Sequence, residues 1–200
     1  MFLSLLLSSF LTFMELNCEN LFDTRHDSLK NDLEFLPDGS YKWTPYRYWA
    51  KLNHLGQEIV AQSNPIPDFV AMCEVENDSV MFDLTRRSLL RNAGYEYVMT
   101  SSPDERGIDV ALLYQPASFA LLHSHSIRIK PLPDTRPTRD ILYASGLIIT
   151  GDTLHVFVVH APSRRGGEQA SRPYRLHVAS QLAEAVDSVY AISRDAKIII

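Results

Sequence analysis

Cysteine is scarce in this sequence, and so are basic residues. The only cysteines among the 200 residues are Cys18 and Cys73, which form no C-x-x-C pair. Neither a zinc ribbon nor a cysteine-stapled secreted module is therefore expected. A single disulfide bond between Cys18 and Cys73 stays an open alternative. Lys and Arg number 19 against 24 Asp and Glu, a formal net charge of −5. Bulk electrostatic binding of nucleic acid needs many cations, so any contact with phosphate must be local.

Apolar runs long enough to span a bilayer are also missing. Residues 1–13 are mostly Leu, Phe and Ser, which suits a signal-peptide core, but the run lacks the basic residues that normally open a signal peptide and no A-x-A-like site follows it. Part of this run could equally be a buried first strand. We therefore expect no stable membrane span, an apolar leader over 1–13 and one domain over 14–200. Two cellular locations stay open: the protein is exported if the leader is a signal peptide, and otherwise it is cytoplasmic.

Hydrophobic residues make up 46% of the chain and charged residues 22%, an ordinary globular balance. Residues 23–45 are rich in Asp, Asn, Gly and Pro and predict a long functional surface loop. Periodicity predicts helices over 46–62 and 78–92 and a third that opens at Ser171 and Pro173. Strands are predicted over 12–17, 68–73, 95–99, 108–114, 119–129, 141–150, 154–159 and 197–200. This mixture indicates an α/β or α+β sandwich, and the apolar strand at Ile200 suggests a fragment.

Asn17 and Glu19 are two residues apart at the end of the first predicted strand. If the strand continues through Cys18, both side chains share one face and Cys18 points away. An amide oxygen beside a carboxylate suits Mg²⁺, which prefers oxygen ligands. The alternative is an Asx-type turn that ends the strand.

Glu74 directly follows five apolar strand residues, and two more acids lie within the next four positions. Carboxylates at the carboxyl ends of strands lie where α/β folds build their sites. Residues 76–78 also suit the start of a helix, with Asn77 or Asp78 as its N-cap and Glu76 near its positive end. We therefore assign these three to capping and only Glu74 to metal binding.

Asp109 follows Arg106 and precedes the apolar run VALLY. A buried carboxylate needs a cation or a histidine as partner, whereas one on a solvent face needs none. Alternation alone leaves both placements open. Arg106, just before the strand, could face a phosphate.

His160 ends an apolar run and is followed by Ala161, Pro162, Ser163, Arg164, Arg165 and two glycines. A histidine at a strand end can exchange a proton near neutral pH, and arginines on a flexible loop can hold anionic oxygens through forked hydrogen bonds. A structural histidine beside a solvated loop is the plainer interpretation, but the combination favours a site. The other six histidines have no comparable setting, and no H-E-x-x-H motif supports zinc.

Four segments together resemble the successive motifs of the endonuclease/exonuclease/phosphatase family. They are ELNCENLFD (15–23), FVAMCEVEN (69–77), RGIDVALLY (106–114) and VVHAPSRRGG (158–167). The family includes deoxyribonuclease I, abasic-site endonucleases, neutral sphingomyelinases and inositol polyphosphate phosphatases. The likeness is closest to bacterial members with N-x-E-N-L-F-D and P-S-R-x-G-G, and it covers nearly the whole chain.

The resemblance implies a fold and a set of site residues. The fold is a four-layered α/β sandwich in which two mixed, largely antiparallel sheets pack face to face with helices outside, here incomplete at the C-terminus. Glu74 matches the principal Mg²⁺ ligand, Glu19 an acidic metal-site residue, Asn17 a phosphate- or water-orienting residue and His160 a phosphate-facing histidine. Asp109 is a weaker match to the acid that orients this histidine. Arg106, Arg164 and Arg165 are our own candidates for phosphate contacts.

The implied activity is hydrolysis of a phosphodiester, nuclease-like, by water activated with Mg²⁺ or Mn²⁺. The family's later motifs, G-D-x-N and S-D-H, have no counterpart before Ile200, so we expect the 200-residue chain itself to have little activity. Two alternatives stay open: a phosphomonoesterase acting on a sugar or lipid phosphate, and a non-catalytic fragment or binding module. The expected partner is a phosphate-ester substrate, with nucleic acid bound only locally, and the expected state is a monomer.

Overall fold

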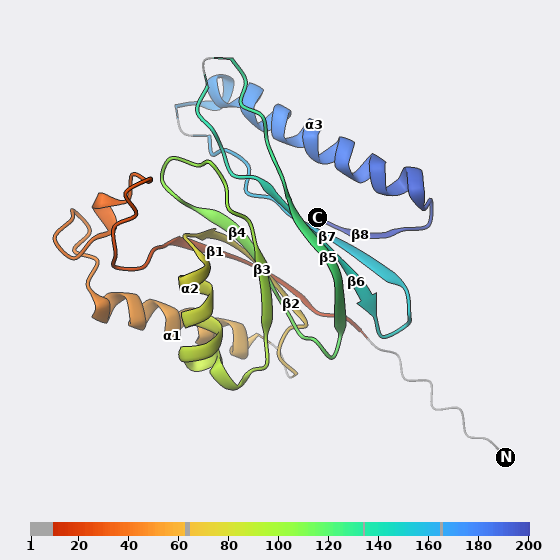
Figure 1. The fold of residues 1–200 in the computed structure, drawn as a ribbon, viewed down its shortest axis with the longest axis horizontal. Helices are drawn as coiled ribbons and strands as arrows, with labels where there is room; N and C mark the ends of the chain where they lie inside the picture. Colours follow the sequence, from red (N-terminus) through yellow and green to blue (C-terminus); the bar gives the residue numbers. More distant parts are fainter. Residues whose placement is uncertain (1–9, 63–64, 134, 165) are drawn as a thin grey trace.

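Two mixed four-stranded sheets lie face to face at the centre of the protein (Figure 1). The structure is a computed structural model that describes residues 10–62, 65–133, 135–164 and 166–200. The first sheet has the order β1-β2-β4-β3 and the second the order β5-β6-β7-β8. β1 pairs with β2 and β7 with β8 in parallel, and the other pairs are antiparallel. Their bounds are β1 Phe13–Leu21, β2 Phe69–Val75, β3 Glu96–Met99, β4 Asp109–Tyr114, β5 Phe119–Ile127, β6 Ile141–Ile148, β7 Thr153–Val158 and β8 Lys197–Ile199.

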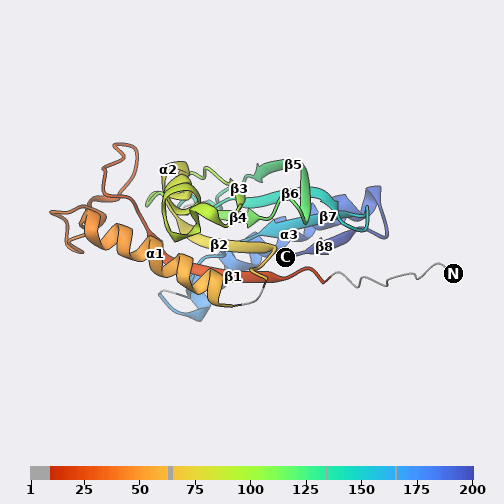
Figure 2. The same cartoon turned by 90° about the horizontal axis from the view of Figure 1, so that it is seen from below.

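Helices cover the outer face of each sheet (Figures 1 and 2). α1 (Pro45–Ala61) and α2 (Asp78–Phe82) pack on the first sheet, and α3 (Glu168–Ile192) packs on the second. Short helical turns are η1 (Leu33–Phe35), the π-helical η2 (Asp83–Arg87) and η3 (Leu89–Asn92). The order helix, sheet, sheet, helix confirms the predicted α/β sandwich.

Each pair of neighbouring layers encloses its own buried core. Phe69, Cys73 and Leu112 of the first sheet meet Phe119 and Val156 of the second. The opposite face of the first sheet packs on α1, α2 and the turns after α2. Because β2 contributes Phe69 and Cys73 to one core and Val70 and Met72 to the other, it is buried on both faces, as its continuous apolar run predicts.

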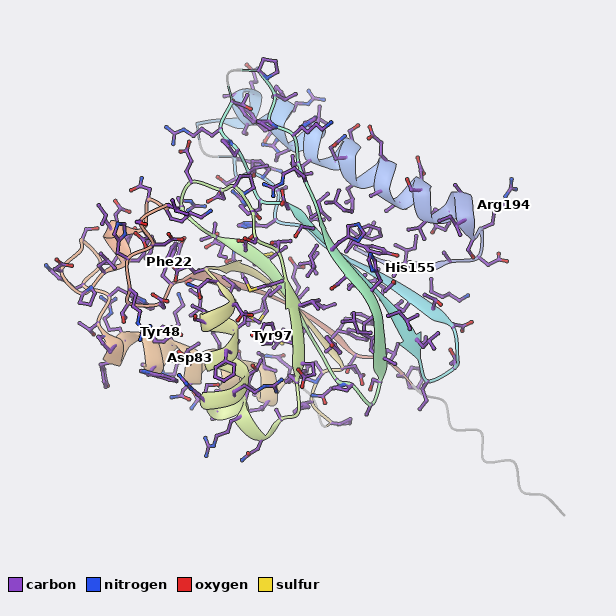
Figure 3. All side chains as sticks on the ribbon, in the orientation of Figure 1. Phe22, Tyr48, Asp83, Tyr97, His155 and Arg194 are labelled. Atoms are coloured by element: carbon purple, nitrogen blue, oxygen red, sulfur yellow. The ribbon has the colours of Figure 1, made fainter. Side chains whose placement is uncertain are left out.

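The second predicted helix is shorter and more irregular than its periodicity indicates. α2 ends at Phe82, and the chain continues through η2 and η3. Ser88 lies between the two turns: its hydroxyl donates to the carbonyl oxygen of Leu84 and accepts from the amide of Leu90 at 3.1 Å. Such local bonds from a serine compete with regular helical bonds, which explains the break. The η2 turn is also bonded to α1, because the Tyr48 hydroxyl donates to Asp83 Oδ2 at 3.0 Å (Figure 3).

The third predicted helix begins earlier than expected. α3 starts at Glu168, after Gly167 with φ 107°, so Ser171 and Pro173 lie inside it and do not open it. The Ser171 hydroxyl donates to the Gly167 carbonyl oxygen at 2.7 Å and closes the first turn. A proline so near a helix start removes few backbone bonds, which is why the helix tolerates it.

β6 and β7 pair in antiparallel fashion across a tight turn in which Gly151 has φ 84°. The expected loop over 23–45 contains η1 and is attached to the core: Trp43 Nε1 donates to the Phe22 carbonyl oxygen at 2.8 Å. Of the leader, residues 1–9 lie outside the described residues, and Phe13 already belongs to β1. Among the described residues, no helix has the length and apolarity needed to cross a membrane.

Candidate active site

Strands β1 and β2 both leave regular geometry at the same point. β1 is in register with β2 up to Asn17 and Cys73, and pairing resumes at Leu21 and Val75. On its other side β2 pairs Cys73 with Val110 and Val75 with Asp109, so Glu74 is an extra residue, a bulge. Three residues in this irregular stretch have positive φ: Glu19 (50°), Asn20 (61°) and Glu74 (62°). Non-glycine residues adopt this conformation at a cost of about 1–3 kcal/mol each, and such strain clusters at functional sites.

The bulge directs the Glu74 carboxylate toward the second sheet. Its Oε2 accepts the backbone N–H of Asn20 at 2.9 Å, which fixes the carboxylate at the β1 irregularity. Its Oε1 lies 3.6 Å from Nε2 of His160. The two side chains are only 17% and 19% exposed. Residues far apart in sequence and on different sheets therefore form one largely buried acid–imidazole pair.

His160 lies two residues beyond the end of β7 and is neutral at physiological pH. Its pKa is lowered to about 4, chiefly by burial and also by the positive charges of Arg139 and Arg106, whereas Glu74 and Asp104 act in the opposite direction. Its buried Nδ1 has no hydrogen-bond partner among the described residues. An anion placed beside the two arginines would offset their effect and raise this pKa toward neutrality.

Arg139 is a site residue that the sequence patterns do not indicate. Its guanidinium donates from Nη2 to the carbonyl oxygens of His160 and Ala161 at 3.1 and 3.2 Å, and Nη1 lies 3.4 Å from Oδ2 of Asp104. These bonds attach the loop before β6 to the loop after β7 and hold His160 in place. Arg139 follows the Pro-rich segment at 131–137, and its position just before an apolar strand is the only signal that the sequence offers.

Asn17 and Glu19 are both exposed, with Cys18 buried between them, as expected for side chains on alternate faces. Asn17 Oδ1 accepts the backbone N–H of Glu19 at 2.9 Å, which is the Asx-type turn of the alternative interpretation. The carbonyl oxygen of Glu19 accepts from Lys51 Nζ at 2.6 Å. Lys51 belongs to α1, and no sequence pattern indicates its role beside this turn.

Asp109 is buried, which is one of the two placements that the sequence left open. Its partners are the hydroxyls of Thr100 and Ser102 and the backbone N–H of Ser102, which lies 3.0 Å from Oδ1. The structure therefore brings Asp109 together with the loop after β3 and does not bring it into hydrogen-bond contact with His160. Several donors satisfy a buried carboxylate without a cation.

The three arginines predicted to contact phosphate have different surroundings. Arg106 is half exposed and lies 4.0 Å from Oδ1 of Asp104. Arg164 is largely exposed and pairs with Glu168 at 3.2 Å, within the first turn of α3. Arg165 lies outside the described residues. Of the two arginines that the structure describes here, Arg106 is the one whose charge acts on His160.

Capping accounts for Asn77 and Asp78, as expected, whereas the Glu76 carboxylate bonds a different segment. Asn77 is the N-cap of α2 and its Oδ1 accepts the backbone N–H of Val80 at 3.0 Å. Asp78 lies in the first turn of α2. Glu76 is buried and accepts the backbone N–H of Asp23 at 2.7 Å.

The donors around Glu74 fit a hard cation better than a soft one. Burial raises the pKa of Cys73 to about 11 and that of Cys18 still further, so neither supplies a thiolate at neutral pH. Within the described parts of the chain, no three His, Cys, Asp or Glu side chains are grouped to hold a metal. The oxygens of Glu74 suit Mg²⁺, which often takes one or two carboxylates and keeps its waters. Asn17 pairs with Cys73, the residue before Glu74, in the register of β1 and β2.

Comparisons with known proteins agree with this architecture. No curated protein matches the chain significantly. Among solved structures, zebrafish TDP2 complexed with a single-strand DNA product is 18% identical with a TM-score of 0.58, over 94% of this chain and 58% of that one. A mannosyl-6-phosphatase from Bacteroides thetaiotaomicron is 17% identical with a TM-score of 0.60, over 94% and 63%. The human Nocturnin catalytic domain with bound sulfate is 20% identical with a TM-score of 0.54, over 73% and 54%.

These likenesses establish the fold, and the chain spans about three fifths of the length of such structures. The profile of the Endonuclease/Exonuclease/phosphatase family matches residues 12–200, nearly the full length of the chain. The four sequence motifs and the two facing sheets agree with this family match. The chain therefore belongs to the endonuclease/exonuclease/phosphatase family.

Proposed function

We propose that the protein is a divalent-metal-dependent phosphoesterase that hydrolyses a phosphodiester. The observation that carries the proposal is the pairing of Glu74 with His160 at 3.6 Å, across two sheets and at strand ends. Membership of the family supports hydrolysis of a phosphate ester in general. The zebrafish TDP2 structure, with its single-strand DNA product, favours a diester of nucleic acid.

In this proposal Glu74 would hold Mg²⁺ or Mn²⁺ with Glu19 as a second acidic residue of the metal site, and Asn17 would orient the phosphate or a metal-bound water. When bound, such an ion supplies a Lewis-acidic charge that offsets the negative charge developing on phosphoryl oxygens. The bond from the Asn20 N–H keeps one Glu74 oxygen in place and leaves the other facing His160. Pre-orientation of this kind removes a reorganisation cost during the reaction.

His160 contributes hydrogen bonding to the phosphate rather than a permanent charge. It is neutral before substrate arrives, because its pKa lies near 4. The negative charge of a phosphodiester beside it would favour the imidazolium, so the ring could take up a proton as the substrate binds. Arg139 positions the ring by holding the His160 carbonyl oxygen, and Arg106, Arg164 and Arg165 are proposed contacts of the anionic oxygens.

A phosphomonoesterase is the second candidate. The similarity to a mannosyl-6-phosphatase favours it, and so does the net charge of −5, which repels long duplex DNA. The two candidates share the Glu74 site and differ in whether the phosphate carries one ester bond or two. A non-catalytic binding module is the remaining alternative.

The test replaces Glu74 by Gln, which keeps the shape and a carbonyl oxygen for the Asn20 N–H but removes the charge. We expect Mn²⁺ affinity, measured by electron paramagnetic resonance, to fall at least about tenfold. Metal-dependent hydrolysis of bis(p-nitrophenyl) phosphate, which we expect to be slow in this chain, should fall with it. The matched control is Glu58→Gln on the exposed side of α1, which should change neither.

The same assay distinguishes a phosphodiesterase from a phosphomonoesterase. Faster turnover of p-nitrophenyl phosphate than of its bis ester would select the monoesterase. Unchanged metal binding and unchanged hydrolysis in Glu74→Gln would overturn the site assignment. The assay also tests the expectation that the 200-residue chain alone turns over slowly.

A further inference from the structure

A cavity of about 600 Å³ is lined in part by Pro162 and Ser163, which follow His160 in the sequence. Three loops and the start of α3 form its walls: the loop between β3 and β4, the loop before β6 and the loop after β7. Its size is that of a typical small-molecule site. Its charged lining residues are Asp104, Glu105, Arg106, Arg136 and Arg139.

The arginines in this wall are incompletely paired. Among the described lining residues, three guanidiniums face two carboxylates. Arg106 lies 4.0 Å from Asp104, Arg136 lies 3.5 Å from Glu105, and Arg139 lies 3.4 Å from Asp104. Well-formed bonds between a guanidinium and a carboxylate are about 2.7–2.9 Å long. The wall therefore retains a net positive charge and unused hydrogen-bonding capacity.

Arg139 and Arg136 differ in exposure in a way that suits ligand capture. Arg139 is 9% exposed and is held by two carbonyl oxygens, and its buried Nε has no partner among the described residues. Arg136 is 86% exposed, and Glu105 is 52% exposed. Exposed pairs of this kind contribute little stability, so an incoming anion can replace Glu105 at low cost.

The cavity adjoins the loop that carries His160 of the proposed reaction centre. Arg139 lines the cavity and also holds the His160 carbonyl oxygen. Pro162 and Ser163 line it as well, and they follow His160 by two and three residues. A substrate whose scissile phosphate lies at Glu74 and His160 would extend along these residues. Tyr174 and Pro137 offer apolar surface for the carbon skeleton of such a substrate.

We infer that this cavity, which we call the arginine pocket, binds a second anionic group of the substrate, with Arg136 as its main contact. The inference rests on the proposed function, because it places the scissile phosphate at Glu74. It narrows the substrate class to molecules with two anionic groups on one skeleton. A nucleotide with two phosphates and a sugar bisphosphate share this chemistry.

Isothermal titration calorimetry in the presence of a chelator tests the inference without any hydrolysis. The ligands are two matched pairs: thymidine 3′,5′-bisphosphate with thymidine 5′-monophosphate, and fructose 1,6-bisphosphate with fructose 6-phosphate. We expect the bisphosphate of one pair to bind about tenfold more tightly, since one charge-assisted contact contributes about 1.5 kcal/mol. The pair that shows the difference identifies the skeleton.

Arg136→Gln should remove most of that difference and leave the affinity for the monophosphate unchanged. Arg136→Lys keeps the positive charge but loses the forked pair of N–H donors, so its affinity for the bisphosphate should be intermediate. The control is Arg87→Gln, a largely exposed arginine paired with Asp83 on η2, which should change no affinity. Circular dichroism checks that each variant is folded.

Equal affinity for mono- and bisphosphates in both pairs would overturn the inference. So would an equal loss for both ligands in Arg136→Gln, because that pattern indicates a general electrostatic effect. Neither result bears on metal-dependent hydrolysis, which is measured separately with Glu74→Gln. The titration can therefore contradict the arginine pocket while the Glu74→Gln measurements still support the proposed function, and the reverse also holds.

Discussion

Glu76 is a buried acid that lies just beyond the proposed metal ligand. Burial raises its pKa to about 8; the backbone N–H of Asp23 acts against this rise, and the charges of Asp23, Asp32 and Asp27 add to it. At neutral pH the side chain is therefore mostly protonated in the folded protein. Its ordinary pKa in the unfolded chain is near 4.5.

This residue predicts a loss of stability as pH rises. Between pH 4.5 and about 8 the unfolded chain releases the Glu76 proton while the folded protein retains it, so the free energy of unfolding falls across this window. Glu76→Gln cannot ionise and should be more stable than the unmodified protein at pH 8, by about 2–4 kcal/mol. Urea unfolding of both proteins at pH 5 and pH 8, with a chelator, measures the difference. An identical difference at both pH values would contradict the prediction.

The residues of the candidate site differ in how far the sequence indicates them. Glu74 and His160 each end a conspicuous apolar run, so the hydrophobic pattern alone singles them out. Arg139 and Lys51 belong to no such pattern, and their importance comes from carbonyl oxygens of distant segments. Backbone acceptors carry no sequence signature, so contacts of this kind could not be predicted.

At the scale of elements, β5 and β6 approach each other closely at Gly146. A Cβ at this position would lie 2.6 Å from the Ala120 carbonyl oxygen and 2.6 Å from the ring of Phe119. Both atoms belong to β5, which pairs with β6 along this stretch. Glycine is required here by space and not by backbone conformation.

Gly146→Ala should therefore separate the two strands or displace the Phe119 ring. We expect a loss of about 1–3 kcal/mol in the free energy of unfolding, the usual cost of overpacking. Ser126→Ala, at an exposed position of β5, is the control and should change stability by no more than about 0.5 kcal/mol. Chemical denaturation measures both, and equal midpoints for the two variants would refute the steric argument.

Helix boundaries show where periodicity alone misleads. The apolar spacing over 78–92 continues past Phe82, but the hydroxyl of Ser88 and a π-helical turn interrupt the regular helix. Serine and proline are typical of helix starts and predict a start at Ser171, whereas α3 begins directly after Gly167. Side-chain bonds within one turn decide both cases, and hydrophobic spacing does not report them.

At the scale of the whole molecule, one aromatic cluster joins the two sheets. Phe119 of β5 is buried and its ring contacts Phe69 of β2 and Tyr114 of β4 edge to face, with centroids 5.1 and 5.6 Å apart. The proposed reaction centre depends on this junction, because Glu74 and His160 come from opposite sheets.

Phe119→Ala should weaken the junction and lower the free energy of unfolding by about 3–5 kcal/mol, the usual cost of removing a buried phenyl ring. Leu122→Ala, at a largely exposed position on the same strand, is the control and should cost far less. Near-ultraviolet circular dichroism with urea measures both variants. If Phe119→Ala were as stable as Leu122→Ala, the cluster would not be what holds the sheets together.

The sequence by itself determined most strands, the helix α1, the fold class and the two residues of the central pair, because each depends on a local pattern or a motif. Tertiary structure alone decided that Glu74 is a bulge held by the Asn20 N–H, that Asp109 pairs with Thr100 and Ser102, and that Arg139 holds His160. The physical reason is that strand register and loop packing set which distant groups meet. Those geometries depend on contacts between layers, and no short stretch of sequence encodes them.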